Sequence, residues 1–201
     1  TLLELYTSEG CSSCPSADRW LSGFKTDPRL WQQVIPVGFH VDYWNYLGWE
    51  DPYSSQRYSQ RQRNYHNSNY LKSVYTPGFV KNGREWRTWF GMRQLKQEET
   101  ANVGVLSLTL KNNTLNLNFE PEQAKYKKLQ ANIVLLGFDI QHAIGGGENQ
   151  GKTLHHDFVV LNFENKILKK NADRYNGQWP WPNKTQATQK HAIAVWLSTP
   201  Q

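Results

Sequence analysis

The sequence is poor in sulfur and lacks long apolar runs, and each shortage excludes a class of protein. It has two cysteines and one methionine among 201 residues, so it is not a disulfide-rich scaffold. No run approaches the roughly 20 apolar residues of a transmembrane helix. The N-terminus begins in a strand-like pattern, without the basic and apolar regions of a signal peptide. We therefore expect either a cytosolic protein or a mature chain from which a signal peptide has been removed.

The excess of positive charge is modest and scattered. The net charge is +6, and the segment from Arg57 to Tyr70 interleaves arginine with tyrosine. Such interleaving is found in nucleic-acid-binding surfaces, but it is also typical of a solvated helix face. No nucleic-acid-binding motif accompanies the charge, so we expect a solvated helix face and no nucleic-acid partner.

The two cysteines, Cys11 and Cys14, form a C-x-x-C pair with three possible uses. A structural disulfide over so short a loop stabilises a fold by only about 2 kcal/mol. A zinc site needs four ligands, and none of the six histidines shows H-x3-5-H spacing. Two thiolates and a distant histidine could still hold copper(I), which prefers soft ligands. The third use, a redox pair, needs a strand before the cysteines and a helix after them.

The residues around the pair supply that context. Leu2 to Tyr6 predict a strand, and Pro15 suits the first turn of a helix that continues through apolar positions to Phe24. Cys11 should then lie at a helix N-terminus, where the helix dipole moderately favours a thiolate. We expect Cys11 to be the more exposed cysteine and Cys14 to lie one turn inside.

The rest of the first half continues the alternation of strands and helices, and a Thr-Pro precedes the third strand. The predicted order is β-α-β-α-β-β-α. After the first strand and helix, the expected elements are a strand ending near Asp42, a helix from Asp51-Pro52 toward Tyr70, a strand at Phe79-Val80, a turn at Asn82-Gly83, a returning strand over Arg84 to Thr88, and a helix from Phe90 to Glu99.

This order resembles the thioredoxin fold. More closely, the blocks "ELYTSEGCSSCPSAD", "FHVDYW", "LGWEDPYSS", "RQRNY", "VYTPGFVKNG" and "GENQGKTL" resemble the secreted bacterial thioredoxin-like family known as domain of unknown function 1223. The resemblance implies that Cys11 is the attacking thiolate, that Cys14 is the resolving thiol, and that a cis Pro77 preceded by Thr76 faces Cys11. It also implies a periplasmic or secreted location. The chain departs from thioredoxins in having Glu9-Gly10 before the pair and Ser12-Ser13 within it.

An aromatic stretch, "HVDYWNYLGWEDPY", follows the second predicted strand. Trp44 and Trp49 are candidates for the border of a substrate cleft around the cysteines. Asp42 is a candidate proton acceptor for Cys14. The alternative interpretation is a packed aromatic corner in which Asp42 caps the chain and Asp51 starts a helix.

From about residue 101 the pattern changes to short apolar strands separated by turns such as Asn112-Asn113, Gly145 to Gly147 and Asn176-Gly177. We expect an antiparallel β-sandwich-like domain over residues 101–201, after a thioredoxin-like domain over residues 1–100. The predicted fold class is therefore α+β, with the boundary near residues 98–103.

One motif in the second half resembles a nucleotide-binding loop. "GGENQGKT" matches the phosphate-loop pattern, which functions only when a helix follows. A strand pattern follows Thr153 instead, so we expect a glycine-rich hairpin loop and no nucleotide site.

His155 and His156 alternate faces in this strand and do not readily ligate one ion. A metal site that includes His142 remains an alternative to exposed histidines.

The sequence thus predicts an extracytoplasmic thiol-disulfide oxidoreductase without a cofactor. Cys11, Cys14, Thr76 and Pro77 would act on protein or small-molecule thiols and disulfides. Two other functions stay open: a copper(I)-handling protein, and a non-catalytic binding module on a thioredoxin-like scaffold.

Overall fold

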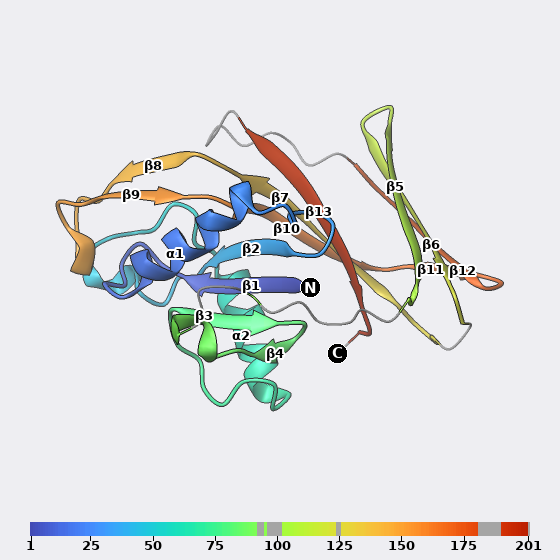
Figure 1. Ribbon diagram of the computed structural model, residues 1–201, viewed down its shortest axis with the longest axis horizontal. Coiled ribbons are helices and arrows are strands. Elements are labelled where there is room, and N and C mark those ends of the chain that lie inside the picture. Colours follow the sequence, from blue (N-terminus) through green and yellow to red (C-terminus); the bar gives the residue numbers. More distant parts are fainter. Residues whose placement is uncertain (92–94, 96–101, 124–125, 181–189, 201) are drawn as a thin grey trace. The chain divides into compact units, whose positions relative to one another are not determined.

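The computed structural model describes residues 1–91, 95, 102–123, 126–180 and 190–200. Strands dominate these residues, and two α-helices and four short 3₁₀ helices accompany them (Figure 1). The chain divides into two compact units. The first comprises Thr1–Gln97, Leu136–Leu161 and Gln186–Ala192, and the second comprises Glu98–Leu135, Asn162–Thr185 and Ile193–Gln201. Each unit therefore draws on both halves of the sequence.

Three apolar N-terminal segments form the centre of the first unit. The strands β1 (Leu2–Thr7) and β2 (Ile35–His40) pair in parallel, and β3 (Gly78–Lys81) pairs antiparallel to β1. All but the first residues of β1 and β2 are buried, as in parallel strands covered on both faces. A tight turn at Asn82-Gly83, with φ angles of 50° and 82°, leads into β4 (Arg84–Glu85). This hairpin turn confirms the Asn-Gly prediction.

The sheet extends beyond these strands into segments from the second half of the sequence. Its order is β13-β7-β10-β2-β1-β3-β4, and β10 pairs with β2 in parallel where Val159 lies opposite Gly38. The added strands are β7 (Gln130–Gly137), β10 (Val159–Ile167) and β13 (His191–Ser198). A separate hairpin consists of β8 (Ile140–Ala143) and β9 (Thr153–His156).

Helix α1 (Cys14–Ser22) connects β1 to β2 through the 3₁₀ helix η1 (Gly23–Thr26). Pro15 occupies its first turn, as predicted. Its buried residues are Cys14, Ala17, Asp18 and Leu21, and it packs against β1, β2 and β9. The first residue of α1, Cys14, thus lies in the interior of the unit.

Helix α2 (Gln56–Asn67) begins after Ser55, whose side chain accepts a hydrogen bond from the Arg57 amide. The predicted start at Asp51-Pro52 is wrong, because the Asp51 carboxylate accepts hydrogen bonds from other parts of the chain. The predicted stripe of Tyr58, Gln62 and Tyr65 is buried. The interpretation of the helix as a solvated basic face is wrong in part, because Arg61 forms a bidentate ion pair with the buried Glu4 of β1.

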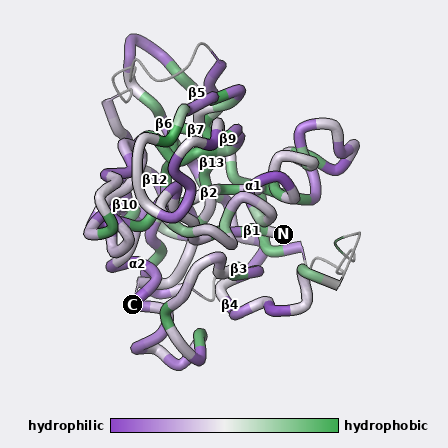
Figure 2. Tube along the Cα trace, turned by 90° about the vertical axis from the view of Figure 1, so that its left-hand side faces the viewer, coloured by the Kyte–Doolittle hydropathy of each residue, from purple (hydrophilic) through white to green (hydrophobic). Residues whose placement is uncertain are grey.

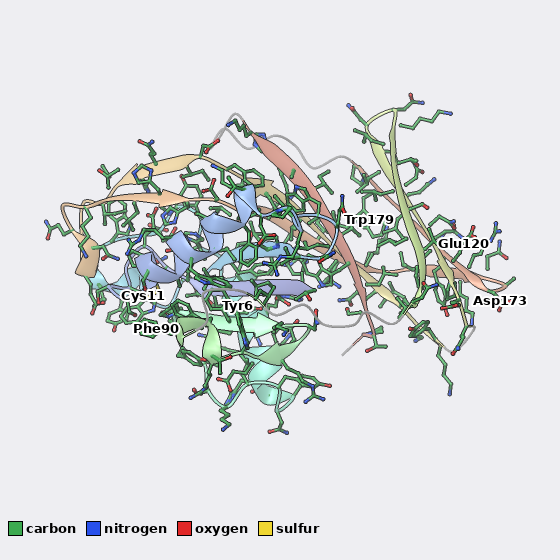
Figure 3. All side chains as sticks on the ribbon, in the orientation of Figure 1. Tyr6, Cys11, Phe90, Glu120, Asp173 and Trp179 are labelled. Atoms are coloured by element: carbon green, nitrogen blue, oxygen red, sulfur yellow. A yellow bond between two sulfur atoms is a disulfide. The ribbon has the colours of Figure 1, made fainter. Side chains whose placement is uncertain are left out.

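The second unit contains a four-stranded sheet of order β11-β12-β6-β5. Its strands are β5 (Gly104–Lys111), β6 (Thr114–Pro121), β11 (Lys169–Asn171) and β12 (Arg174–Pro180). Hydrophobic and hydrophilic residues alternate along β5 and β6 (Figure 2). The alternation buries Leu115, Leu117 and Phe119 in a core with Tyr175 and Trp179, and Figure 3 labels Trp179 within this unit.

The predicted fold class is wrong. The described residues are mainly β-structure in several sheets, and they do not show a thioredoxin-like βαβαββα fold. The physical reason is long-range pairing, since β10 forms hydrogen bonds with β2 rather than completing a sandwich among the C-terminal strands. The helix predicted from Phe90 to Glu99 lies mostly outside the described residues, and Thr88–Gly91 form the 3₁₀ helix η3.

Two predictions about turns in the second half have opposite outcomes. Asn112-Asn113 form the β5–β6 turn, with φ angles of 49° and 54°. The turn predicted at Asn176-Gly177 is wrong, because both residues lie within β12 and the chain reverses between β11 and β12 instead.

None of the described helices has the length and apolar character needed to span a membrane.

Candidate functional site

The two cysteines are joined in a disulfide at the start of α1 (Figure 3). The Cys11 amide donates to the Ser8 carbonyl at 3.2 Å, and the Cys14 amide donates to the Cys11 carbonyl at 3.2 Å. The cysteines are 1% and 0% exposed, whereas Ser12 and Ser13 between them are exposed. Both sulfurs are therefore buried in the disulfide form, and the expectation that Cys11 is the more exposed cysteine stays a prediction.

A side chain from the β8–β9 hairpin fixes the backbone around Cys11. The buried amide of Asn149 donates to the carbonyls of Glu9 and Cys11, at 2.8 Å each. Lys152 donates to the Asn149 side-chain oxygen at 2.9 Å, which leaves the amide nitrogen directed at the two carbonyls. We name Glu148, Asn149 and Lys152 the cysteine clamp.

The same hairpin loop, residues 144–152, also contacts the linker between the cysteines. The Glu148 carboxylate accepts a hydrogen bond from the Ser12 amide at 2.8 Å, and this bond holds the pKa of Glu148 below its ordinary value. A side chain on Gly145 or Gly146 would collide with Trp49 or with the Gly48 carbonyl. The G-x-x-x-x-G-K-T motif therefore forms a hairpin loop against the cysteines, and the strand β9 follows it as predicted.

A buried carboxylate lies directly before the cysteines. Glu9 is 0% exposed, and its oxygens lie 3.0 Å from His142 Nδ1 and accept a 2.9 Å hydrogen bond from Trp49 Nε1. His156 Nε2 lies 3.2 Å from Glu9 Oε1, an ion-pair distance. Burial raises the pKa of Glu9, but the interactions with His156 and Trp49 outweigh burial and hold the pKa below its ordinary value.

A buried ion pair lies behind Glu9. His40 Nδ1 and Asp51 Oδ2 are 2.7 Å apart, and Asp51 also accepts a hydrogen bond from the Glu9 amide at 2.9 Å. Burial lowers the pKa of His40, but the Asp51 carboxylate outweighs burial and raises the pKa to about 9. Burial raises the pKa of Asp51, whereas the charged His40 lowers it below its ordinary value.

A second buried acid lies on the same face of α1 as Cys14. Asp18 is 6% exposed, and its Oδ2 lies 3.8 Å from His156 Nδ1. Burial raises the pKa of Asp18, and the charges of His156 and His40 offset only part of that increase. Buried carboxylates and imidazoles thus form a connected group next in sequence to Cys11 and on the α1 face that carries Cys14.

The structure brings several sequence-predicted residues close to the cysteine loop. Trp44 donates to the Thr76 hydroxyl at 2.7 Å, and its Cβ lies against Gly10, directly before Cys11. The peptide bond between Thr76 and Pro77 is cis, as the resemblance implied. Trp49 reaches Glu9. Asp42 instead forms hydrogen bonds with Ser59 of α2, so its described contacts give no sign of an interaction with Cys14.

The histidines considered for a metal site occupy different environments. His155 is exposed, His142 is partly exposed, and His156 is buried, so the expectation of exposed histidines is wrong for His156. Within the described part of the chain, no three histidine, cysteine, aspartate or glutamate side chains are placed to hold a metal ion.

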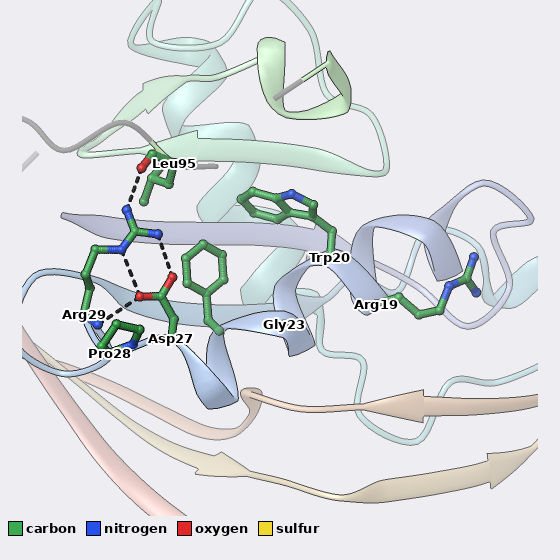
Figure 4. Close-up of a pocket in the computed structure, with 8 residues that line it drawn as sticks. Arg19, Trp20, Gly23, Asp27, Pro28, Arg29 and Leu95 are labelled. Atoms are coloured by element: carbon green, nitrogen blue, oxygen red, sulfur yellow. Dashed lines mark hydrogen bonds and ion pairs between the residues drawn. The ribbon is translucent and has the colours of Figure 1, made fainter. Parts of the chain in front are cut away.

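A separate pocket of about 620 Å³ lies at the other end of α1 (Figure 4). Trp20 and Phe24 line it with ring centroids 5.1 Å apart. Arg29 is held by a bidentate ion pair with Asp27 and by the Leu95 carbonyl. Neither cysteine lines this pocket. It is therefore not an extension of the cysteine site.

Sequence reasoning missed most of the polar residues of the site. Asp18 carries a local signal, because an acid four residues after Cys14 falls on the helix face that also buries Ala17 and Leu21. His142, Asn149 and His156 carry no local signal, since they lie more than 120 residues away and reach Glu9 or the Cys11 backbone only through tertiary pairing.

Comparisons with known proteins identify one family and two solved structures of similar fold. A family model described as "Protein of unknown function (DUF1223)" matches residues 2–198. No curated protein matches the chain.

Two solved structures are similar to the chain in fold. A crystal structure of a protein from Agrobacterium tumefaciens has a TM-score of 0.62 at 21% identity, over 96% of this chain and 76% of that one. HBP35 of Porphyromonas gingivalis has a TM-score of 0.63 at 14% identity, over 99% of this chain and 69% of that one. At these identities the similarity concerns the fold alone.

Proposed function

The chain belongs to the family described as protein of unknown function, DUF1223, and from the geometry of its site we propose that it catalyses thiol-disulfide exchange through Cys11 and Cys14. The substrates would be thiols or disulfides of proteins or small molecules. The reaction would proceed through a mixed disulfide on Cys11, which Cys14 resolves.

One observation carries this proposal. The disulfide closes a loop too short to stabilise the fold by more than about 2 kcal/mol, yet three side chains from a distant hairpin fix the backbone around it. Two buried carboxylates, Glu9 and Asp18, accompany it in the interior. A purely structural disulfide has no need for buried groups that exchange protons. A redox pair has such a need, because its thiols gain and lose protons in each cycle.

Access to the sulfurs requires movement, since both are buried in the disulfide form. The exposed Ser12 amide is held by the Glu148 carboxylate, so release of this bond would open the linker toward an incoming thiol. Trp44, Trp49, Thr76 and Pro77 are each partly exposed. They are our candidates for substrate contact, together with the more distant Asp42 from the sequence analysis.

The proposed location is extracytoplasmic. Disulfides persist in oxidising compartments such as the periplasm and are rare in the cytosol, and the chain's two cysteines are joined to each other. The pairing uses every cysteine of the sequence, which avoids mispairing during oxidative folding.

Trapping of the mixed disulfide tests the proposed function. The Cys14→Ser variant, incubated with oxidised glutathione or with a scrambled disulfide-containing protein, should accumulate a mixed disulfide on Cys11 that intact-mass spectrometry detects. The matched Cys11→Ser variant should trap much less. Equal trapping by the two variants would contradict the assigned roles. Tight copper(I) binding by the reduced protein without any exchange would favour the copper-handling alternative.

A further inference from the structure

The buried face of α1 presents an acid one helical turn after Cys14. Side chains four residues apart on a helix have Cβ atoms about 5–6 Å from each other, and both Cys14 and Asp18 belong to the buried face. Cys14 is 0% exposed. In this form water has no direct access to its sulfur, so a neighbouring protein group offers a proton a faster route to or from Cys14 than solvent does.

Two neighbouring buried groups carry polar atoms without a hydrogen-bond partner. Within the described residues, Asp18 Oδ2 and His156 Nδ1 have no partner of hydrogen-bond geometry, whereas His156 Nε2 lies at ion-pair distance from Glu9. Buried polar atoms without partners reduce stability and are rare in folded proteins. Their presence one turn from a sealed cysteine points to a use in its chemistry.

These groups continue a row of titratable side chains to the surface. Asp18 Oδ2 lies 3.8 Å from His156 Nδ1, and His156 Nε2 lies 3.2 Å from Glu9 Oε1. Both Glu9 oxygens lie 3.0 Å from His142 Nδ1. The His142 side chain is 30% exposed, so the row ends in solvent.

We propose that Asp18, His156, Glu9 and His142 form a proton path between the Cys14 sulfur and solvent. The inference rests on the proposed thiol-disulfide exchange and assigns to these residues the proton transfer that the exchange requires. An imidazole suits such a path, because it accepts a proton at one ring nitrogen and donates one from the other.

The path operates when Cys14 resolves a mixed disulfide. Asp18 accepts the proton of the Cys14 thiol, and the resulting thiolate attacks the Cys11 sulfur. The Cys11–Cys14 bond forms as the bond from Cys11 to the substrate sulfur breaks, and the substrate leaves as a thiolate. The cysteine pair is oxidised and the substrate is reduced by two electrons. In the reverse direction, the departing Cys14 thiolate takes its proton from Asp18.

The surroundings of Asp18 suit a proton acceptor for a thiol. His156 of β9, His40 of β2 with its partner Asp51, and the Thr7 hydroxyl of β1 face it. Burial raises the pKa of Asp18 toward that of a thiol, and electrostatic interaction with His156 and His40 offsets part of this increase.

The reaction of the reduced protein with dithiobis(nitrobenzoate) tests the path. Stopped-flow absorbance should show a first release of nitrothiolate, from attack by Cys11, and a second release, from attack by Cys14. Asp18→Asn should slow the second release by about 100-fold at neutral pH, the size typical of general acid–base catalysis. It should also make that release rise about tenfold per pH unit, because hydroxide then replaces Asp18 as the base. The first release should not change.

Ser22→Ala is the matched control, because it removes another unpartnered side-chain oxygen of α1 that lies outside the path. Both of its phases should match those of the wild type. An Asp18→Asn protein with the wild-type second phase and pH profile would overturn the path while leaving the proposed function intact. A wild type that releases no second nitrothiolate would overturn both.

A variant at the exposed end of the path gives an independent test if Asp18→Asn fails to fold. His142→Gln should slow the second release several-fold, and free imidazole in the buffer should restore it without affecting the wild type. If neither the substitution nor imidazole changes the second release, the path does not end at His142 and the proposal fails.

Discussion

Asn149 illustrates how one side chain connects distant parts of the first unit. It donates to the carbonyls of Glu9 and Cys11 and accepts a hydrogen bond from Lys152. Asn149→Ala would leave two carbonyls without these donors. A buried acceptor that loses its partner costs about 1–3 kcal/mol. We expect urea denaturation of the oxidised protein to show a free energy of unfolding lower by about 2 kcal/mol or more.

Gln150 provides the control for this substitution, because it is the exposed neighbour of the buried Asn149. Gln150→Ala should leave the free energy of unfolding within about 0.5 kcal/mol of the wild type. Equal effects of the two substitutions would show that the hydrogen bonds of Asn149 contribute little.

The His40–Asp51 pair predicts how stability depends on pH. The pKa of His40 is raised from 6.5 to about 9 in the folded protein, so its contribution is complete below pH 6.5 and disappears as the pH rises to about 9. The shift corresponds to a loss on the order of 3 kcal/mol across this window. The lowered pKa of Asp51 affects stability at acidic pH instead. There, protonation of the carboxylate removes the stabilisation that the ionised Asp51 provides.

Urea denaturation at a series of pH values measures this dependence. The wild type should lose stability between pH 6.5 and 9, whereas His40→Gln should be less stable at neutral pH and should lack this decline. A decline of the same size in His40→Gln would mean that another group is responsible.

At the scale of single residues, the sequence revealed groups with a local signature. The C-x-x-C pair and the aromatic residues Trp44 and Trp49 were identified as site candidates from the sequence alone. Asp51 was mistaken for a helix cap because Asp-Pro is a common start of a helix. Its true partner, His40, lies on a strand 11 residues earlier, and only tertiary structure brings the two together.

At the scale of elements, the 144–152 loop contacts the backbone around the disulfide. In Figure 1 it lies at the same end of the first unit as the start of α1, and the Glu148 carboxylate holds the Ser12 amide. Glu148→Ala removes this bond. We expect dithiothreitol to reduce the disulfide several-fold faster in the variant, while the midpoint of thermal unfolding stays close to that of the wild type.

Glu50→Ala, at an exposed glutamate outside the clamp, controls for the loss of a negative charge near the surface. The rate of reduction should not change in this variant. If Glu148→Ala is also reduced at the wild-type rate, the bond to Ser12 does not limit access to the cysteines.

Turns with a distinctive local sequence could be predicted, whereas the residues at which strands begin and end could not. The hairpin turns at Asn82-Gly83 and Asn112-Asn113 formed where these residues adopt positive φ. Asn176-Gly177 has the same turn chemistry but lies within β12, where pairing with β6 places Gly177 opposite Leu117. Tertiary pairing overrides a turn propensity when it satisfies the backbone of the whole strand.

At the scale of the whole molecule, the predicted fold class failed because strands were assigned to the nearest part of the sequence. Periodicity located most strands but held no information on their partners, such as β10 beside β2. The division into domains at residues 1–100 and 101–201 stays a prediction. The first unit includes Leu136–Leu161, which supplies the groups that surround Glu9.

A fragment of residues 1–100 tests that division. It would lack His142, His156 and Asn149, so the buried Glu9 would lose most of its partners. An isolated buried charge is strongly destabilising. We expect the fragment to show no cooperative thermal unfolding by circular dichroism, in contrast to the full chain. A cooperative transition in the fragment would establish residues 1–100 as a domain that folds on its own.

The central claim is that the Cys11–Cys14 disulfide is redox-active in the folded protein, and its reduction potential tests this most directly. The native protein would be equilibrated in glutathione and dithiothreitol buffers of graded potential, and alkylated thiols would be counted by mass spectrometry. We predict one reversible two-electron transition between about −270 and −120 mV, the range of known thiol-disulfide oxidoreductases, with circular dichroism unchanged. A disulfide that stays intact below about −300 mV, or that is reduced only when the protein unfolds, would show that the pair is structural and contradict the account.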